Sequence, residues 1–107
     1  MMGGENMIKT ELLNVAGTPI QGICIQAPGG QGHPNMLILL AKKGYVMCGY
    51  LNQDAAKKFG DAACVVSGAS FNEILSSTVK SVSPEAEALG IQVGMTGAHA
   101  CEILNKE

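Results

Sequence analysis

The chain has 107 residues, a net charge of −2 at pH 7 and an apolar content of 47%. This length is typical of one domain with its own core, so we expect residues 1–107 to form a single domain with a flexible N-terminal stretch at 1–6. Arg is absent and the seven basic residues, all Lys, are scattered along the chain. Nucleic-acid binding is therefore not expected, because it normally needs a clustered basic face.

No apolar run reaches the ~18 residues that a membrane span requires. The N-terminus lacks the basic and apolar regions of a signal peptide, so we expect a cytoplasmic protein without membrane attachment. The four cysteines contain no C-x-x-C pair, which argues against a zinc ribbon or a thioredoxin motif. Their simplest interpretation is that of small core residues in a reducing compartment; they are Cys24, Cys48, Cys64 and Cys101.

The first half of the chain predicts a set of strands. Residues from Ile20 to Ala27 alternate in polarity, and the stretch from Met36 to Ala41 is apolar on both faces, as expected of a central strand. The Gly- and Pro-rich stretch 28–34 excludes regular structure, and Gly44 closes a turn before the next strand returns antiparallel. The predicted strands span 7–14, 20–27, 36–41 and 45–51.

The second half mixes helices with strands. Four polar residues each precede a short helical stretch as its predicted cap, and one of them, Ser70, also forms a capping box with Glu73. These caps are Asn52, Ser70, Ser83 and Thr96, and the predicted strands lie at 62–66 and 79–82. The order of elements predicts an α+β domain with a single mixed, largely antiparallel β-sheet and short helices packed on it.

Two segments resemble the signatures of a known family. Gly44-Tyr-Val-Met-Cys-Gly-Tyr-Leu-Asn52 is similar to the central signature of the YunC-like family, a bacterial and archaeal domain of unknown function. Ala88-Leu-Gly-Ile-Gln-Val-Gly-Met-Thr-Gly97 is similar to its C-terminal signature. The resemblance covers about Ile20 to Leu104 and implies a compact α+β fold with a mixed sheet. It implies no reaction and no cofactor.

Three positions depart from that family pattern. Asn52 stands where an acid usually follows the central motif, and Ala69 stands where Arg commonly precedes the capping residue. His99 stands where the last helix often carries Glu. A family chemistry that needed these groups would be altered in this chain.

Cys48 is the candidate catalytic residue. It lies near the end of an apolar strand, four residues before the predicted cap Asn52, and Gly49 leaves room for a ligand. The positive end of a helix can lower a thiol pKa from ~8.5 to between ~3.5 and ~7.5. The alternative interpretation is a structural thiol, because burial without a nearby cation raises a thiol pKa.

The turn Gly94-Met95-Thr96-Gly97 is the second candidate site. Glycines at a helix start let backbone N–H groups face a carboxylate or phosphate. The Gly-Lys-Ser/Thr ending of a P-loop is absent, and the alternative is a tight turn with Thr96 as an ordinary cap. His99 and Glu102 share a helix face but lack a third ligand, so no metal site is predicted.

The leading hypothesis is a domain that binds a small anionic ligand near Cys48, through Gly49, Asn52, Gly94, Met95, Thr96 and Gly97. One alternative is a thiol-dependent enzyme in which Cys48 is a nucleophile or redox centre. A second alternative is a non-catalytic regulatory or interaction module. We also expect a homo-oligomer, with a dimer favoured, because only 15% of the residues are charged and short helices leave much of a sheet uncovered.

Overall fold

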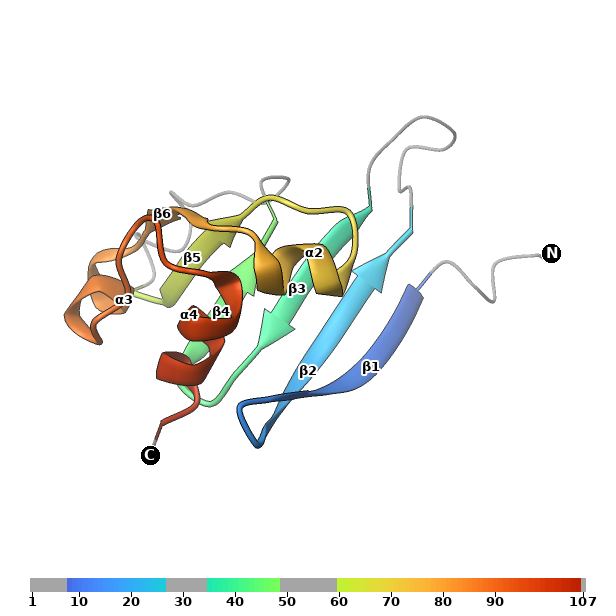
Figure 1. Cartoon of the computed structure of the whole chain (residues 1–107), viewed down its shortest axis with the longest axis horizontal. Coiled ribbons are helices and arrows are strands. Elements are labelled where there is room, and N and C mark those ends of the chain that lie inside the picture. The colour runs from blue at the N-terminus through green and yellow to red at the C-terminus, as the bar shows by residue number, and fades with distance from the viewer. Residues whose placement is uncertain (1–7, 27–34, 49–59, 107) are drawn as a thin grey trace, which may run out of the picture.

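Strands that pair with their neighbours in sequence form most of the fold (Figure 1). The computed structural model describes residues 8–26, 35–48 and 60–106. Within them the strand order is β1-β2-β3-β4-β5-β6. The bounds are β1 (Ile8–Val15), β2 (Thr18–Ile25), β3 (Met36–Leu40), β4 (Gly44–Met47), β5 (Ala62–Val66) and β6 (Val79–Val82).

All neighbouring strands except one pair run antiparallel. β4 and β5 are parallel, with Val46 opposite Cys64, and the chain between them passes through residues 48–61. The described sheet is thus mixed and largely antiparallel, which confirms the predicted α+β class. The predicted first two strands are displaced by one or two residues, because the structure places them at Ile8–Val15 and Thr18–Ile25.

A two-residue turn joins β1 to β2. Ala16 and Gly17 both have positive φ, at 52° and 85°. A type I′ hairpin turn, whose twist matches that of the flanking strands, requires positive φ at both of its central residues. The side chain of Asn14 accepts a hydrogen bond from the N–H of Gly17 at 3.0 Å. This turn fixes the register of the hairpin, in which Leu13 lies opposite Ile20.

The helices begin at the predicted caps. Ser70 accepts from the N–H of Glu73, while the Glu73 carboxylate accepts from the N–H of Ala69 at 2.7 Å. Ser83 and Thr96 cap the other two described helices through their hydroxyl oxygens. The helices are α2 (Phe71–Ser76), α3 (Pro84–Ala88) and α4 (Gly97–Leu104).

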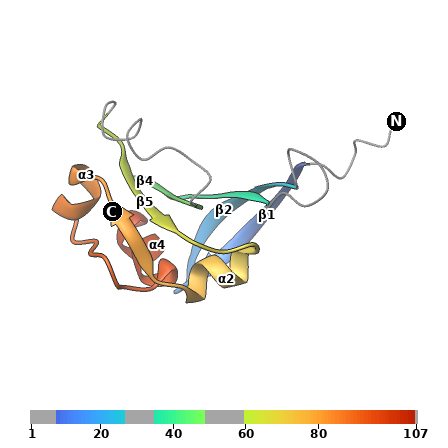
Figure 2. The ribbon, with the colours of Figure 1, turned by 90° about the horizontal axis from the view of Figure 1, so that it is seen from above.

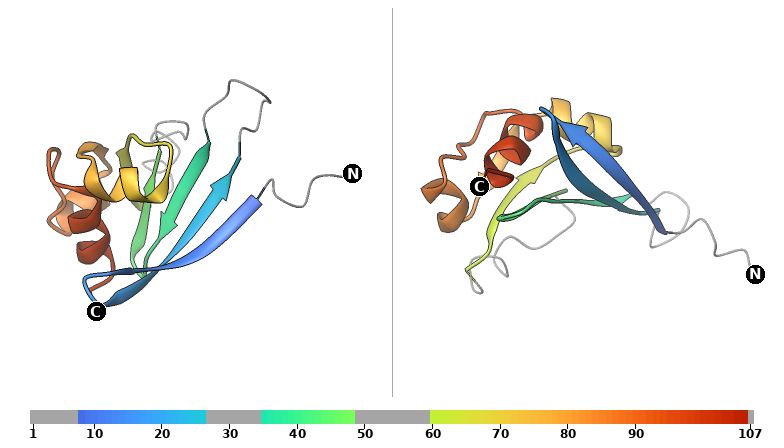
Figure 3. Two further views of the ribbon diagram at one scale, coloured as in Figure 1. Left: turned by 45° about the vertical axis from the view of Figure 1, so that its right-hand side comes forward. Right: turned by 90° about the horizontal axis from the view of Figure 1, so that it is seen from below.

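The described helices all lie on one face of the sheet, which curls around them (Figures 2 and 3). Leu39, Val46 and Cys64 are fully buried on this face against residues of the helices. Met47 and Ala63 form a second, smaller buried cluster with Tyr45 and Val65. Tyr45 and Met47 thus face away from Val46 along β4.

Two buried polar residues join the helical layer to the sheet. Ser83 donates to the carbonyl of Asp61 at 2.6 Å and accepts from the N–H of Ala63 at 3.0 Å. Asn105, at the end of α4, accepts from the N–H of Lys42 and donates to the carbonyl of Pro19. A buried polar group needs such partners, and these bonds set where the helices sit on the strands.

The helix predicted after Asn52 lies outside the described residues, as do Gly49 and the stretch 49–51 of the predicted strand. Among the described helices none is long and apolar enough to cross a membrane.

Candidate functional site

Cys48 lies in the core between the sheet and the helical layer. Its side chain is 4% exposed. Its Sγ accepts a hydrogen bond from the N–H of Leu37 at 3.3 Å, and its own N–H donates to the Leu37 carbonyl at 3.1 Å. The burial of the Cys48 side chain favours a structural thiol over a catalytic one. Its predicted neighbours Gly49 and Asn52 lie outside the described residues.

The Gly94–Gly97 turn uses its backbone amides within the fold. The N–H of Gly94 donates to the Val79 carbonyl at 3.0 Å, and that of Gly97 donates to the Ser77 carbonyl at 2.8 Å. The N–H of Met95 donates to the Gln92 carbonyl at 3.3 Å. An anion site needs amides that are open to a ligand, so these three bonds count against the predicted one. The hydroxyl of Thr96 accepts from the N–H of His99, which confirms the cap.

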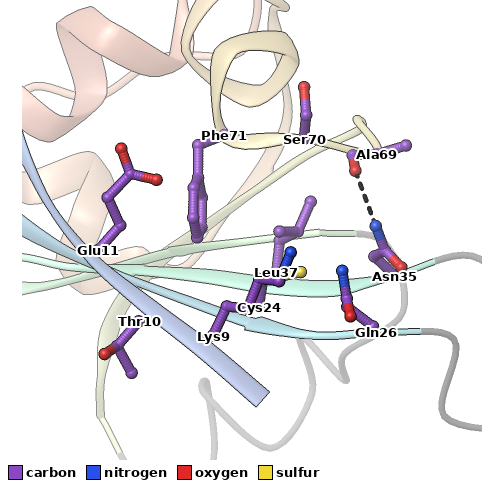
Figure 4. Close-up of a pocket in the computed structure, with 10 residues that line it drawn as sticks. All are labelled: Lys9, Thr10, Glu11, Cys24, Gln26, Asn35, Leu37, Ala69, Ser70 and Phe71. Atoms are coloured by element: carbon purple, nitrogen blue, oxygen red, sulfur yellow. Dashed lines mark hydrogen bonds between the residues drawn. The ribbon is translucent and has the colours of Figure 1, made fainter. Parts of the chain in front are cut away.

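A pocket lies elsewhere, between the first three strands and the turn that precedes α2. Its cavity volume is about 430 Å³. Polar and apolar side chains both line it, and Figure 4 shows their arrangement. The lining residues are Lys9, Thr10, Glu11, Cys24, Gln26, Asn35, Leu37, Ala69, Ser70 and Phe71.

The floor of the pocket is formed by side chains of two neighbouring strands. Cys24 of β2 lies opposite Leu37 of β3, and both are buried. The ring of Phe71 forms a wall above β2, where a Cβ on Gly22 would come within 2.8 Å of it. Gly22 therefore leaves the space that lets Phe71 approach the strand. Cys48 is not among the residues that line the pocket, although its Sγ accepts a hydrogen bond from the N–H of Leu37 on the floor.

The rim of the pocket is held by hydrogen bonds between elements distant in sequence. The side-chain amide of Asn35 donates to the carbonyl of Ala69 at 3.2 Å (Figure 4). The capping box of α2 holds the same turn, because the N–H of Ala69 donates to Glu73. Ala69, one of the departures from the family pattern, thus lies at the pocket, whereas His99 is exposed on α4.

Burial raises the pKa of the Cys24 thiol in the pocket floor by more than the positive charge of Lys9 lowers it. Burial raises the pKa of the Cys24 thiol; the Lys9 ammonium opposes this and the nearby Cys48 thiol adds to it, with a net upward shift. Cys24 is therefore mostly a neutral thiol at pH 7. Glu11, which lies on the same side of β1, places a negative charge at the Phe71 end of the pocket (Figure 4).

Over the described residues no group of three His, Cys, Asp or Glu side chains is placed to hold a metal ion. The pocket instead offers amide, hydroxyl and charged groups around a small apolar floor.

Over the described residues the fold is that of a small α+β domain in which a curled mixed sheet carries three helices on one face. Residues 47–104 match the family described as "Domain of unknown function (DUF1805)", and the chain belongs to this YunC-like family. It is 27% identical over 99 residues to "Uncharacterized protein YunC" of Bacillus subtilis (strain 168), covering 88% of this chain and 94% of that protein. The predicted resemblance is confirmed.

A solved structure shares the fold. The crystal structure of the protein of unknown function TA1206 from Thermoplasma acidophilum superimposes with a TM-score of 0.82 at 30% identity. The match covers 92% of this chain and 94% of that one.

Thiol labelling of the native protein tests the role of the cysteines. Among Cys24, Cys64 and Cys101 we expect Cys24 to react first, because it lines the pocket while the other two are fully buried. Burial also raises the pKa of Cys64 and of Cys101 to about 12, and the thiolate is the reactive form. The measurement is mass-spectrometric mapping after brief alkylation at pH 7. Preferential labelling of Cys48 would instead favour the thiol-enzyme alternative.

Proposed function

We propose that this domain binds a small organic ligand with an anionic group in the pocket between β1, β2, β3 and the turn before α2. The observation that carries the proposal is the pocket itself, with Lys9 beside a floor of Cys24 and Leu37. The proposed ligand class is still the anionic one predicted from the sequence. The proposed binding site is now this pocket instead of the Gly94–Gly97 turn.

The size of the cavity supports a small ligand. Pockets for small molecules commonly measure about 300–1,000 Å³, and this one, at about 430 Å³, lies near the lower limit. A metabolite of a few carbon atoms fits such a space better than a nucleotide does. The bond between Asn35 and Ala69 supports a site formed before the ligand arrives, which lowers the entropy loss on binding.

The two charges indicate how such a ligand would lie. Lys9 would attract a carboxylate or phosphate to the Cys24 end, where the side chain of Gln26 also lines the pocket. Glu11 would repel an anion, so the other end of the ligand should carry a hydroxyl or amino group that donates to it. A hydroxy acid or an amino acid has this chemistry.

The thiol-enzyme alternative lacks such support. Cys48 is buried, and the pKa of Cys24 is raised, chiefly by burial, rather than lowered. A nucleophilic thiol needs the reverse shift. The proposed role is therefore binding, in a protein that we continue to expect in the cytoplasm.

Thermal unfolding with small probes tests the proposal. Inorganic phosphate, glycolate and L-serine are each added and compared with chloride at matched ionic strength. A ligand present at about ten times its Kd adds about 1.4 kcal/mol of stability. In a domain of this size that raises Tm by about 6 °C or more. We expect a carboxylate or phosphate probe to exceed the chloride response.

Two Lys variants make the test specific. Lys9→Gln should remove the response to the active probe, whereas Lys80→Gln should leave it intact, because Lys80 is exposed on β6 and is not among the residues that line the pocket. Equal responses in both variants would show that the anion acts through general electrostatics. A response to no probe above chloride would contradict the proposed ligand class.

A further inference from the structure

The edge strand β1 places its charged and apolar residues on unexpected sides. Lys9 and Glu11 point to the helix-covered side of the sheet, where they line the pocket. Ile8 and Leu12, which alternate with them, are 63% and 70% exposed. A sheet with one solvated face normally shows the reverse pattern, with apolar residues inside and polar ones outside. The outer side of β1 is therefore built for contact with something other than water.

The same surface continues across the next two strands. Ile23 of β2 lies opposite Ile38 of β3; both are partly buried, and neither belongs to the two clusters of the core. Leu40, at the end of β3, is 40% exposed. We call this surface the outer face and define it by Ile8, Leu12, Gln21, Ile23, Ile25, Ile38 and Leu40.

None of the seven residues that define the outer face carries a charged side chain. In a two-fold dimer the same surface patch meets itself, so any charge near the axis would face a like charge. A charge-free apolar face avoids this repulsion. A partner of opposite charge, by contrast, would find nothing on this face to pair with. The charge pattern thus favours a second copy of the chain as the occupant.

Pairing of the sheets face to face is favoured over pairing through the edge of β1. Inward-pointing charges on an edge strand are one of the devices that discourage edge-to-edge addition, and Lys9 and Glu11 occupy such positions. Two sheets can instead stack ~10 Å apart with their apolar side chains interdigitated. From the usual strand spacing, the face of β1 to β3 has a flat area of about 400 Å² per copy. Two such faces approach the ~1,000 Å² at the lower limit of specific interfaces.

We infer that the outer face of β1, β2 and β3 is a homodimer interface in which two copies pack sheet against sheet. The contact is isologous and apolar, and its small area makes the dimer dependent on protein concentration. The ligand pocket lies on the opposite side of the sheet, so dimerisation leaves it open.

Light scattering and sedimentation velocity over about 5 to 500 µM test the interface, a range chosen to bracket a micromolar Kd. The weight-average mass should rise from near 11.1 kDa toward twice that value. Leu12→Glu should hold the mass at the monomer value at every concentration, because the two-fold axis brings the new carboxylates together. Ile8→Glu is a second variant on the same face with the same expected result.

Val93→Glu is the matched control. Val93 is 62% exposed in the segment between α3 and α4, so the same charge is added at a similar exposure but outside the outer face. This variant should dimerise like the parent, and circular dichroism should show all three variants folded. A parent protein that stays at 11.1 kDa throughout would overturn the inference. So would a dimer that survives both Leu12→Glu and Ile8→Glu.

Discussion

Gly97→Ala is expected to destabilise the domain by several kcal/mol, although Ala is the better helix former. A Cβ at position 97 would lie 2.0 Å from the carbonyl oxygen of Ile74, which belongs to the backbone of α2. No side-chain rotation relieves a contact with backbone, so α4 would have to move away from α2. Overpacking typically costs about 1–3 kcal/mol and sometimes more, and this movement would also disturb the bond from the Gly97 N–H to Ser77.

Two effects of opposite sign compete in this substitution. Helix propensity alone predicts that Ala gains up to ~1 kcal/mol over Gly, whereas the contact with Ile74 predicts a larger loss. Gly90→Ala is the control, since a Cβ there meets nothing within 4 Å and its only strain comes from a φ of +106°. Urea unfolding of both variants measures the difference. A Gly97→Ala protein as stable as its parent would contradict the close approach of the two helices.

The close approach of Gly97 to the Ile74 carbonyl oxygen means that substitutions at Gly97 cannot test the predicted anion site at the turn. A bulky residue at Gly97 would disrupt the packing of α4 on α2 whether or not the turn binds a ligand. Loss of ligand binding in such a variant would therefore carry no information about the turn. The test of the pocket does not have this problem, because Lys9→Gln changes an exposed residue of the edge strand.

The elements were predictable because their signals are local. The caps at Ser70, Ser83 and Thr96 each place a hydroxyl three residues before an N–H that it binds. The apolar stretch at Met36–Ala41 indicated an interior strand, and β3 is the third of the six described strands of the sheet. The register of the first hairpin was harder to predict, since Val15 extends β1 up to a two-residue turn.

The pocket was missed because nothing local marks it. Lys9, Cys24 and Asn35 stand far apart in the sequence and come together only when β1 to β3 pair and α2 packs across them. One signal was available. Lys9 and Glu11 are followed at the same spacing of two by Leu13 and Val15, so a charged pair shares one side of the strand with core residues. Such a mixture on the inner side of an edge strand indicates a polar cavity.

The predicted anion site at the Gly94–Gly97 turn has a related weakness. Glycines beside a helix start show that backbone amides can be close to a ligand, but they do not show whether those amides are already occupied. Here the N–H of Gly94 donates to Val79 of β6, a tertiary contact that the turn sequence does not reveal.

Stability should fall steeply above pH 9, and two buried thiols give the main reason. Burial raises the pKa of Cys64 from 9.0 to about 12, with the nearby Cys101 adding to the shift, and burial raises that of Cys101 from 9.0 to about 12. The pKa of Tyr45 is likewise raised from 10.0 to about 12, chiefly by burial and then by its hydrogen bond to Asp61. In each case the fold favours the neutral form.

The direction of the effect follows from linkage. Below pH 9 the two thiols are protonated in both the folded and the unfolded state, so their contribution to stability is complete. Between pH 9 and about 12 the unfolded chain releases protons that the folded chain retains, and the free energy of unfolding decreases with pH. One pKa unit corresponds to about 1.4 kcal/mol, so two such thiols would remove about 5 kcal/mol between pH 9 and pH 11.

Urea unfolding from pH 7 to pH 11 in the presence of a reductant measures this loss. Cys101→Ala should reduce the slope of stability against pH by about one proton, even though the cavity it leaves lowers stability at pH 7. These thiols should contribute equally to stability at pH 7 and pH 8. The free energy of unfolding begins to fall only near pH 9, where the thiols of the unfolded chain ionise. A stability that is flat up to pH 11, or a slope unchanged in Cys101→Ala, would show that these thiols are not held neutral by the fold.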